Sequence, residues 1–316
     1  MKRLSFFIFL SLLVGLSSCG KTDEEKLKIK YNQIELALNN RDCTEAQKVL
    51  TTITGQELIP KYIKLKSVIT ACFGGFDLLG FFLNEIPTLA SSSGSLLGSL
   101  TQFSYSNMTS PTDSNYLKIK SAINTLMYAG GVTSSSNANR SAVFGKAQAD
   151  QLDINLLYLT LVQMGKFFQY YGEVDNNLPT NPAPTLYKGT ALGSTSNCIL
   201  TYTTAATALL PPLGTNLCNI GVTSPGSADL PDIALNPLTK TRLCEGIILF
   251  NNFIDLVANI DLVGSNVLSG LATNFTSLCS TAGITTCDIR DQAVCEATAD
   301  LEIESFYAVL LEEQLP

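Results

Sequence analysis

Residues 15 to 22 read GLSSCGKT, which matches the spacing G-x-x-x-x-G-K-T of a loop that binds phosphate groups. In such a loop, backbone N–H groups and the N-terminus of the following helix hold the phosphates. The chemistry would be nucleotide binding, and it requires a buried strand before Gly15 and a helix after Thr22. The residues around the motif therefore decide whether this stretch can bind a nucleotide.

The residues before Gly15 are those of an export signal and not of a strand that leads into a phosphate loop. Lys2 and Arg3 place two positive charges at the start, and the run LSFFIFLSLLVGL at 4 to 16 carries none. As a helix this run would be about 20 Å long, short of the roughly 30 Å of a bilayer core. A charged start followed by a short apolar run is typical of an export signal. The rest of the chain also lacks the alternation of strands and helices that a doubly wound sheet needs.

Residues 1 to 19 resemble the signal peptide of a bacterial lipoprotein, because Leu16-Ser17-Ser18-Cys19 forms the cleavage box after the charged and apolar regions. The resemblance implies a cut before Cys19, a diacylglyceryl group on its thiol and an acyl chain such as palmitate on its new amino group. Each buried CH₂ contributes about 0.8 kcal/mol, so two or three chains anchor a protein almost permanently. Gly20, where Asp would imply the inner membrane, implies the outer membrane. We therefore expect a protein of the cell outer membrane, lipid-anchored and either periplasmic or surface-exposed.

The composition restricts the possible functions. The chain has 20 Lys and Arg against 27 Asp and Glu, which disfavours nucleic acid as a partner. It has no histidine, so Ser-His-Asp and Cys-His catalysis and histidine-ligated zinc are excluded. We expect no catalytic residues, no metal, and no cofactor apart from the covalent lipid on Cys19. The expected partners are the lipid bilayer, through the acyl anchor, and an envelope protein.

Nine cysteines fit an exported protein. If Cys19 carries lipid, the other eight form an even set, which in an oxidising compartment predicts four disulfides. A zinc site is disfavoured because no C-x-x-C pair occurs. The eight disulfide candidates are Cys43, Cys72, Cys198, Cys218, Cys244, Cys279, Cys287 and Cys295.

Helix geometry predicts one of these pairs, and the chain order suggests the others. Cys43 begins a predicted helix and Cys72 ends the next, so antiparallel packing would bring the two cysteines to the same level. The remaining pairs follow from position, with one inside the loop-rich insertion, one between two helix starts and one closing a short turn. They are Cys198–Cys218, Cys244–Cys295 and Cys279–Cys287.

Apolar residues recur at helical spacing and predict a mainly α fold, a helical-hairpin or repeat-like bundle stapled by disulfides. Leu27, Tyr31, Ile34 and Leu38, for example, share one helix face. We expect a signal peptide over 1–18, a lipidated tether over 19–30, an N-terminal helical region over 31–171, a loop-rich insertion over 172–237 and a C-terminal helical region over 238–316. Later helices are predicted over about 60–72, 115–129, 141–171, 239–260, 265–280 and 289–313.

The stretch that contains Ala37, Asp42, Ala46 and Leu50 is similar to the turn between the two helices of a tetratricopeptide repeat. A second segment begins about 34 positions further on, which is the period of that repeat. The resemblance covers about 27–72 and implies helical hairpins. It extends no further, since there is no third copy.

Three other segments could carry a site. Glu296, Asp300 and Glu304 are four apart and could hold a metal or exchange protons, but a solvated helix face explains them more simply. Residues 173–177 offer oxygen ligands for calcium but lack the glycine of a calcium loop, so a plain loop is favoured. The apolar run 73–103 is expected to be buried core.

These observations favour a non-enzymatic, membrane-anchored helical lipoprotein of the bacterial envelope that serves as a protein-binding scaffold. The alternative is a ligand-binding accessory of a periplasmic transport system, because some tetratricopeptide-like lipoproteins are similar in layout. A hydrolase that uses only carboxylates is a third hypothesis. A ligand binder would need a pocket, which we expect among the phenylalanines of residues 73–82.

Overall fold

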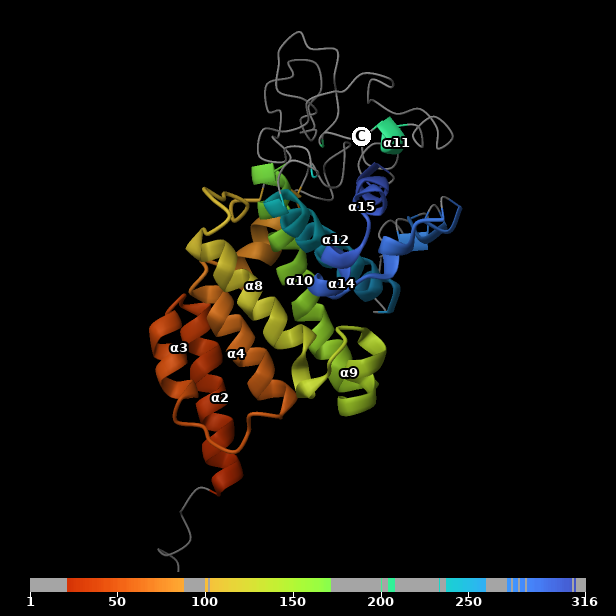
Figure 1. Ribbon diagram of the computed structural model, residues 1–316. Coiled ribbons are helices and arrows are strands. Elements are labelled where there is room, and N and C mark those ends of the chain that lie inside the picture. The colour runs from red at the N-terminus through yellow and green to blue at the C-terminus, as the bar shows by residue number, and fades with distance from the viewer. Residues whose placement is uncertain are drawn as a thin grey trace, which may run out of the picture. The chain divides into compact units, whose positions relative to one another are not determined.

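The computed structural model describes residues 22–87, 100–101, 103–171, 200, 204–207, 233, 237–259, 272–273, 275–277, 279–281, 283–308 and 310. These residues are mostly helical and include no strand, so the mainly α fold is confirmed (Figure 1). Among the described helices, none combines the length and the apolar character that a membrane span requires. The expected signal peptide, Cys19, and almost all of the expected insertion over 172–237 lie outside the described residues.

The chain divides into two compact units, Met1–Gln56 and Glu57–Pro316. The boundary falls inside the predicted helical region 31–171. The described part of the first unit holds two helices, α2 (Asp23–Asn39) and α3 (Cys43–Leu50), which contact each other. Thr22 and Glu25 form a capping box that starts α2. Most of the expected 19–30 tether is therefore helical from Asp23 on.

A sharp turn joins α2 to α3. Arg41 has a positive φ of 59°, which lets the chain reverse within three residues. Asp42 then caps α3 by accepting a hydrogen bond from the Glu45 amide. The turn thus has the helical-hairpin form expected from the sequence, while the tetratricopeptide-like repeat remains an interpretation of residues 27–72.

The second unit is built around four helices: α4 (Pro60–Cys72), α8 (Ser114–Met127), α10 (Lys146–Tyr171) and α12 (Pro237–Asn259). Helix α10 contacts the other three, and most of its side chains from Leu152 to Tyr171 are buried. Glycines allow the closest approaches. A Cβ at Gly246 of α12 would collide with the Tyr307 hydroxyl and with the Phe167 ring of α10. The smaller elements are α5 (Leu78–Gly80), η1 (Phe81–Glu85), η2 (Ala129–Gly131), α9 (Asn137–Phe144), α11 (Thr204–Thr207), η4 (Thr285–Asp288), α14 (Gln292–Ala297) and α15 (Asp300–Tyr307).

Two predicted long helices are each broken in two. The helix expected over 141–171 is α9 and α10, separated at Gly145, whose φ of 77° is incompatible with a continuous helix. The helix expected over 289–313 is α14 and α15, separated by Thr298 and Ala299 in extended conformation. Lys240 of α12 stabilises this second break, because its ammonium group donates to the Thr298 carbonyl at 2.6 Å. No side-chain periodicity marks either break.

Two disulfides lie in the C-terminal part of this unit. Cys244 of α12 is bonded to Cys295 of α14, and their Cα atoms are 5.6 Å apart. Cys279 is bonded to Cys287, and their Cα atoms are 6.2 Å apart. These are the two pairs expected there from the sequence. Cys43 belongs to the first unit and Cys72 to the second, and that pairing stays a prediction. Cys198 and Cys218 lie outside the described residues.

The apolar run 73–103 is only partly core. Phe76 and Phe81 are buried among Phe103, Tyr105 and Tyr158, with ring centroids 5.3 to 5.9 Å apart. Four other apolar side chains of the same run face solvent, namely Phe73, Leu79, Phe82 and Leu83. The expectation of a uniformly buried segment is therefore wrong at these positions. Residues 88–99 and 102 lie outside the described residues.

Candidate binding cleft

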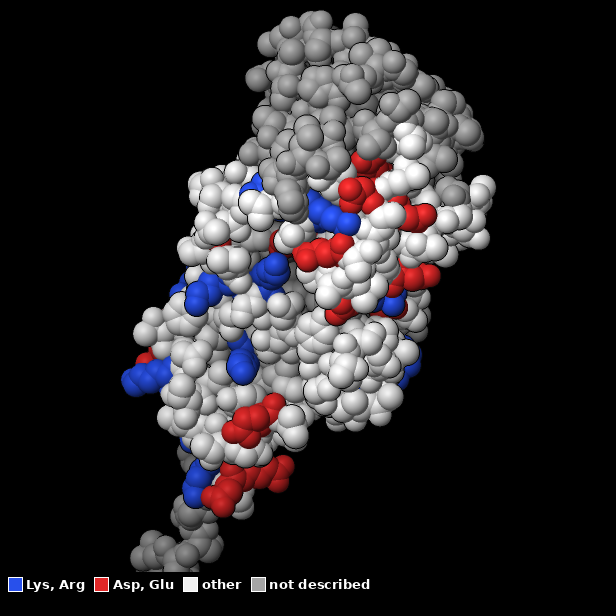
Figure 2. All heavy atoms as spheres, viewed as in Figure 1, with Lys and Arg blue, Asp and Glu red and all other residues white. Residues whose placement is uncertain are grey.

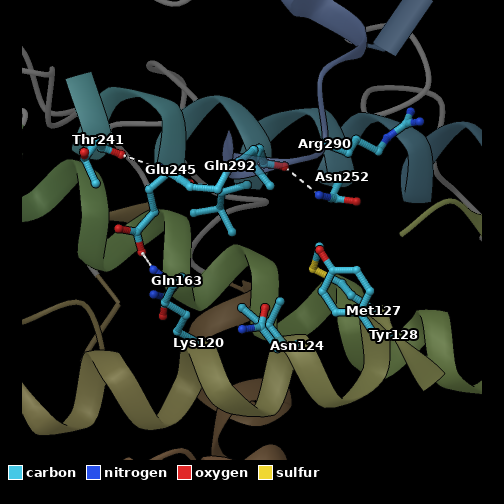
Figure 3. Close-up of a pocket in the computed structure, with 13 residues that line it drawn as sticks. Lys120, Asn124, Met127, Tyr128, Gln163, Thr241, Glu245, Asn252, Arg290 and Gln292 are labelled. Carbon is cyan, nitrogen blue, oxygen red and sulfur yellow. Dashed lines mark hydrogen bonds and ion pairs between the residues drawn. The ribbon is translucent and has the colours of Figure 1, made fainter. Parts of the chain in front are cut away.

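An open cleft of about 290 Å³ lies between α8 and α12. Figure 3 shows the two helices as its walls, with Gln163 of α10 between them and the chain before α14 along the rim. At about 30 Å³ for each water molecule, the volume corresponds to roughly ten waters, which suits only a small ligand. The lining residues are Lys120, Ile123, Asn124, Met127, Tyr128, Gln163, Thr241, Glu245, Ile248, Leu249, Asn252, Arg290 and Gln292.

The wall on the α8 side is formed by residues that recur at the helical period. Lys120, Asn124 and Tyr128 are four residues apart and therefore lie on one stripe of the helix. Asp113 starts the helix by accepting hydrogen bonds from the amides of Asn115 and Tyr116. Desolvation raises the pKa of Asp113, but these bonds and those from Thr109 outweigh it and hold the pKa below its usual range.

Helix α12 and the chain after it form the opposite wall. Glu245 follows the disulfide-bonded Cys244, so the bond to α14 fixes this turn of the helix. Asn251 donates from its amide to the carbonyls of Thr286 and Ile289, both at 2.8 Å, and so holds the segment that precedes the rim. Gln292 closes the rim by donating to the Thr241 carbonyl at 2.9 Å.

One end of the cleft holds an ion pair. Lys120 Nζ lies 2.8 Å from Glu245 Oε1, and the Tyr116 hydroxyl donates to the same oxygen at 2.8 Å. Burial raises the pKa of Tyr116 well above its usual value, and the Glu245 carboxylate raises it further. Tyr116 therefore stays protonated and remains a donor to Glu245. With two donors on one oxygen, this carboxylate is poorly suited to act as a general base.

The other end holds a second paired charge. Arg290 Nη2 lies 3.5 Å from Asp255 Oδ1, and Figure 3 shows the guanidinium pointing away from the cleft. Asp255 also accepts from the Asn137 amide at 2.9 Å. Tyr128 lines the cleft on the α8 side, and burial, followed by the charge of Asp291, raises its pKa. The charged side chains at both ends of the cleft are therefore paired.

Between these ends the lining combines apolar side chains with the amides of Asn124, Gln163 and Asn252. Ile123, Met127 and Leu249 are 4 to 8% exposed and form the apolar walls with Ile248. Gln163 is 2% exposed, and neither its amide nitrogen nor its carbonyl oxygen forms a regular hydrogen bond with the described residues. Its side chain lies beside the Tyr116 hydroxyl and acts to lower the pKa of Tyr116, against the larger effects that raise it. The donor and acceptor groups of Gln163 are therefore available to a water molecule or a ligand.

Acidic and basic side chains of this unit gather over different helices. Figure 2 shows acidic side chains gathered over α14 and α15 and basic ones over α4 and α8. The sequence of these segments supplies Lys61, Lys64, Lys66, Lys118 and Lys120 on one side and Asp288, Asp291, Glu296, Asp300 and Glu302 on the other. Of these residues only Lys120 lines the cleft.

A buried ion pair supports the α9 side of the cleft. Arg140 and Asp153 are both fully buried, with Arg140 Nε 2.5 Å from Asp153 Oδ1. Arg140 also donates to the Ser135 carbonyl, while the Ser135 hydroxyl lies 2.7 Å from Oδ1 of the lining residue Asn252. Removing one partner of such a pair is strongly destabilising. The network therefore fixes where α9 meets α10 and α12.

Glu296, Asp300 and Glu304, which the sequence suggested as a possible metal or proton-transfer site, do not form one cluster. Glu296 accepts from Gln292 at 2.7 Å, and Asp300 pairs with Lys240 at 2.9 Å. The break between α14 and α15 separates them. Glu304 is fully buried, so the expected solvated face is wrong at that residue. Within the described ranges, no group of three His, Cys, Asp or Glu side chains could hold a metal ion.

The phenylalanines of residues 73–82 do not line the cleft, which corrects the expected position of a pocket. None of the cleft residues was singled out in the sequence. The sequence did contain a pattern that could have indicated the cleft. Polar Lys120 and Asn124 recur along an otherwise apolar face of one helix, and polar Glu245 and Asn252 lie two turns apart in another. Residues 173–177 lie outside the described residues. Comparisons with protein-family models, with curated proteins and with solved structures found no match.

Proposed function

We propose that this chain is a lipid-anchored protein of the bacterial outer membrane that binds a small molecule in the cleft between α8 and α12. The observation that carries the proposal is the unpaired Gln163 amide among apolar side chains in an open cleft. The ligand-binding role corresponds to the transport accessory considered from the sequence. The lipid anchor rests on the signal-peptide resemblance at residues 1–19.

Binding is favoured over catalysis by the state of the ionisable groups. Lys120 and Glu245 neutralise each other, and Arg290 is paired with Asp255. A catalytic acid or base needs a pKa near the working pH and access to substrate. The charged side chains that line the cleft are held in these two pairs, so we propose a non-enzymatic role.

Filling the cleft tests the proposal. Ile248→Trp adds bulk at a lining position, whereas Leu117→Trp adds the same bulk at a site on α8 that is 45% exposed and outside the cleft. Native mass spectrometry of protein purified from its own membranes should show a bound small molecule in the wild type and in Leu117→Trp. Ile248→Trp should lose it. If no small molecule accompanies the wild type, the ligand-binding proposal is wrong.

A second role, the protein-binding scaffold expected from the sequence, is supported by a different surface. Leu79, Phe82 and Leu83 are 51, 41 and 66% exposed within one helical segment. Neighbouring exposed apolar side chains of this kind often form part of a protein interface. Substituting all three by serine should abolish co-purification of an envelope protein and leave the bound small molecule in place. If the same proteins co-purify with the triple variant, this surface does not bind them.

A further inference from the structure

The chemistry of the cleft also restricts what its ligand can be. We propose that the ligand is a small uncharged molecule with a secondary amide edge, such as a lactam or a cyclic dipeptide, attached to a short aliphatic body. This inference rests on the proposed function and specifies its ligand class.

The first argument is charge. Lys120 and Glu245 are 2.8 Å apart, and the Arg290 guanidinium points away from the cleft towards Asp255 (Figure 3). An anionic ligand would have to compete with Glu245 for Lys120, and a cationic one with Lys120 for Glu245. A charged ligand would also lose its own hydration on entering. A neutral ligand avoids both costs.

The second argument is the hydrogen-bonding capacity of Gln163. A primary amide has two N–H donors and a carbonyl acceptor. Even if one N–H is directed at the Tyr116 oxygen, a donor and the acceptor remain. Both are unpaired in the described residues. A secondary amide in the cis form presents a donor and an acceptor side by side and can pair with both.

Gln163 is buried beside the Lys120–Glu245 pair, so we infer that a ligand reaches it when Lys120 moves aside. Gln163 lies beside Tyr116, whose hydroxyl donates to Glu245, and Glu245 is paired with Lys120. The Lys120 side chain is 43% exposed. Partly exposed ion pairs contribute little to stability, so this side chain can swing towards solvent at small cost. Glu245 keeps the hydrogen bond from Tyr116 when Lys120 moves.

The third argument is the shape and polarity of the remaining surface. Ile123, Met127, Ile248 and Leu249 offer contact to an aliphatic body. The volume of about 290 Å³ is at the small end of the range for ligand sites, which favours a compact body.

A pair of probe ligands and a pair of variants test the amide recognition directly. ε-Caprolactam has the cis-amide edge, and N-methylcaprolactam lacks only its donor. We expect the purified protein to bind ε-caprolactam about five- to ten-fold more tightly, by saturation-transfer NMR titration, because one hydrogen bond is lost with the methyl compound. Gln163→Met should weaken the binding of both lactams and abolish the difference between them, because ε-caprolactam loses two hydrogen bonds to Gln163 and N-methylcaprolactam loses one. Gln151→Met, an exposed change on the same helix, should alter neither.

The outcomes separate the two proposals. Equal binding of both lactams, an equal loss of both in Gln163→Met, or binding of hexanoate in preference to ε-caprolactam would overturn the amide inference. If ε-caprolactam does not bind but the native protein carries a small molecule that Ile248→Trp loses, the inference is wrong and the proposed function stands. If neither a probe nor a native molecule binds, both are wrong.

Discussion

Gln163 is a buried polar side chain whose amide is not satisfied. Neither its nitrogen nor its oxygen forms a regular hydrogen bond with the described residues. Leaving a buried polar group unpaired costs about 1–3 kcal/mol, and replacement by an apolar side chain of similar shape avoids that cost. We therefore expect the Gln163 amide to form its hydrogen bonds in the ligand-bound state of the protein.

The stability of Gln163→Met reports on this cost. We expect the free energy of unfolding to rise by about 1 kcal/mol, because methionine matches the length of glutamine without the unpaired amide. Urea unfolding measures the change. Gln151→Met serves as the control and should stay within about 0.5 kcal/mol of the wild type. A loss of stability in Gln163→Met would mean that the amide is well paired before any ligand binds.

At the scale of elements, the first turn of α8 positions one wall of the cleft. Asp113 accepts hydrogen bonds from the amides of Asn115 and Tyr116 and from Thr109. These bonds hold its pKa below the usual value, against the desolvation that raises it. A carboxyl group whose pKa is depressed in the folded state stabilises the fold above its unfolded pKa. That contribution is lost as the pH falls through the folded pKa.

Asp113→Ala should cost about 1 kcal/mol at pH 7 through loss of the helix cap. The difference between wild type and variant should shrink below about pH 4, near the unfolded pKa of aspartate. Urea unfolding of both proteins from pH 7 to pH 2.5 measures this difference. Asp113→Asn, which keeps a capping oxygen, should retain most of the stability at pH 7. A difference that does not change with pH would show that the carboxylate charge plays no part in the cap.

The two disulfides of the second unit differ in the length of chain that they close. Cys244–Cys295 spans 51 positions and Cys279–Cys287 spans 8. The chain-entropy relation gives about 4 kcal/mol for the longer loop and about 2.5 kcal/mol for the shorter one. Replacing both cysteines of a pair by alanine should therefore destabilise the protein more for Cys244–Cys295, as measured by urea unfolding without reductant. Equal losses would show that native packing, and not loop closure, sets the effect.

At the scale of the whole molecule, the sequence predicted the helices that have clear end signals. Pro60 correctly marked the start of α4, and the apolar spacing located α8 and α12 to within about two residues. The break at Gly145 was missed although the glycine is itself a local signal. The break at Thr298–Ala299 was missed because a tertiary partner, Lys240, stabilises it. Periodicity along one helix carries no information on such partners.

The cleft could not be derived from the sequence for the same reason. Lys120 and Glu245 are 125 positions apart and belong to separate helices, and only their packing across α10 makes them a pair. The fully buried Arg140 was likewise unexpected, since the sequence gives it no marker that other arginines lack. Helix type is encoded locally, whereas the site depends on which faces of distant helices meet.

The membrane attachment of the whole molecule depends on Cys19. If the lipoprotein resemblance is correct, the wild-type protein should partition into the detergent phase of a cloud-point separation, and Cys19→Ser should not, because it has no thiol to acylate. Cys43→Ser removes a cysteine outside the cleavage box and should partition like the wild type. Intact-mass measurement of the wild type should give the chain from Cys19 onward with the added mass of its acyl groups. If residues 1–18 are retained without acyl mass, the protein has no lipid anchor, and its proposed place in the outer membrane is wrong while the cleft between α8 and α12 is unaffected.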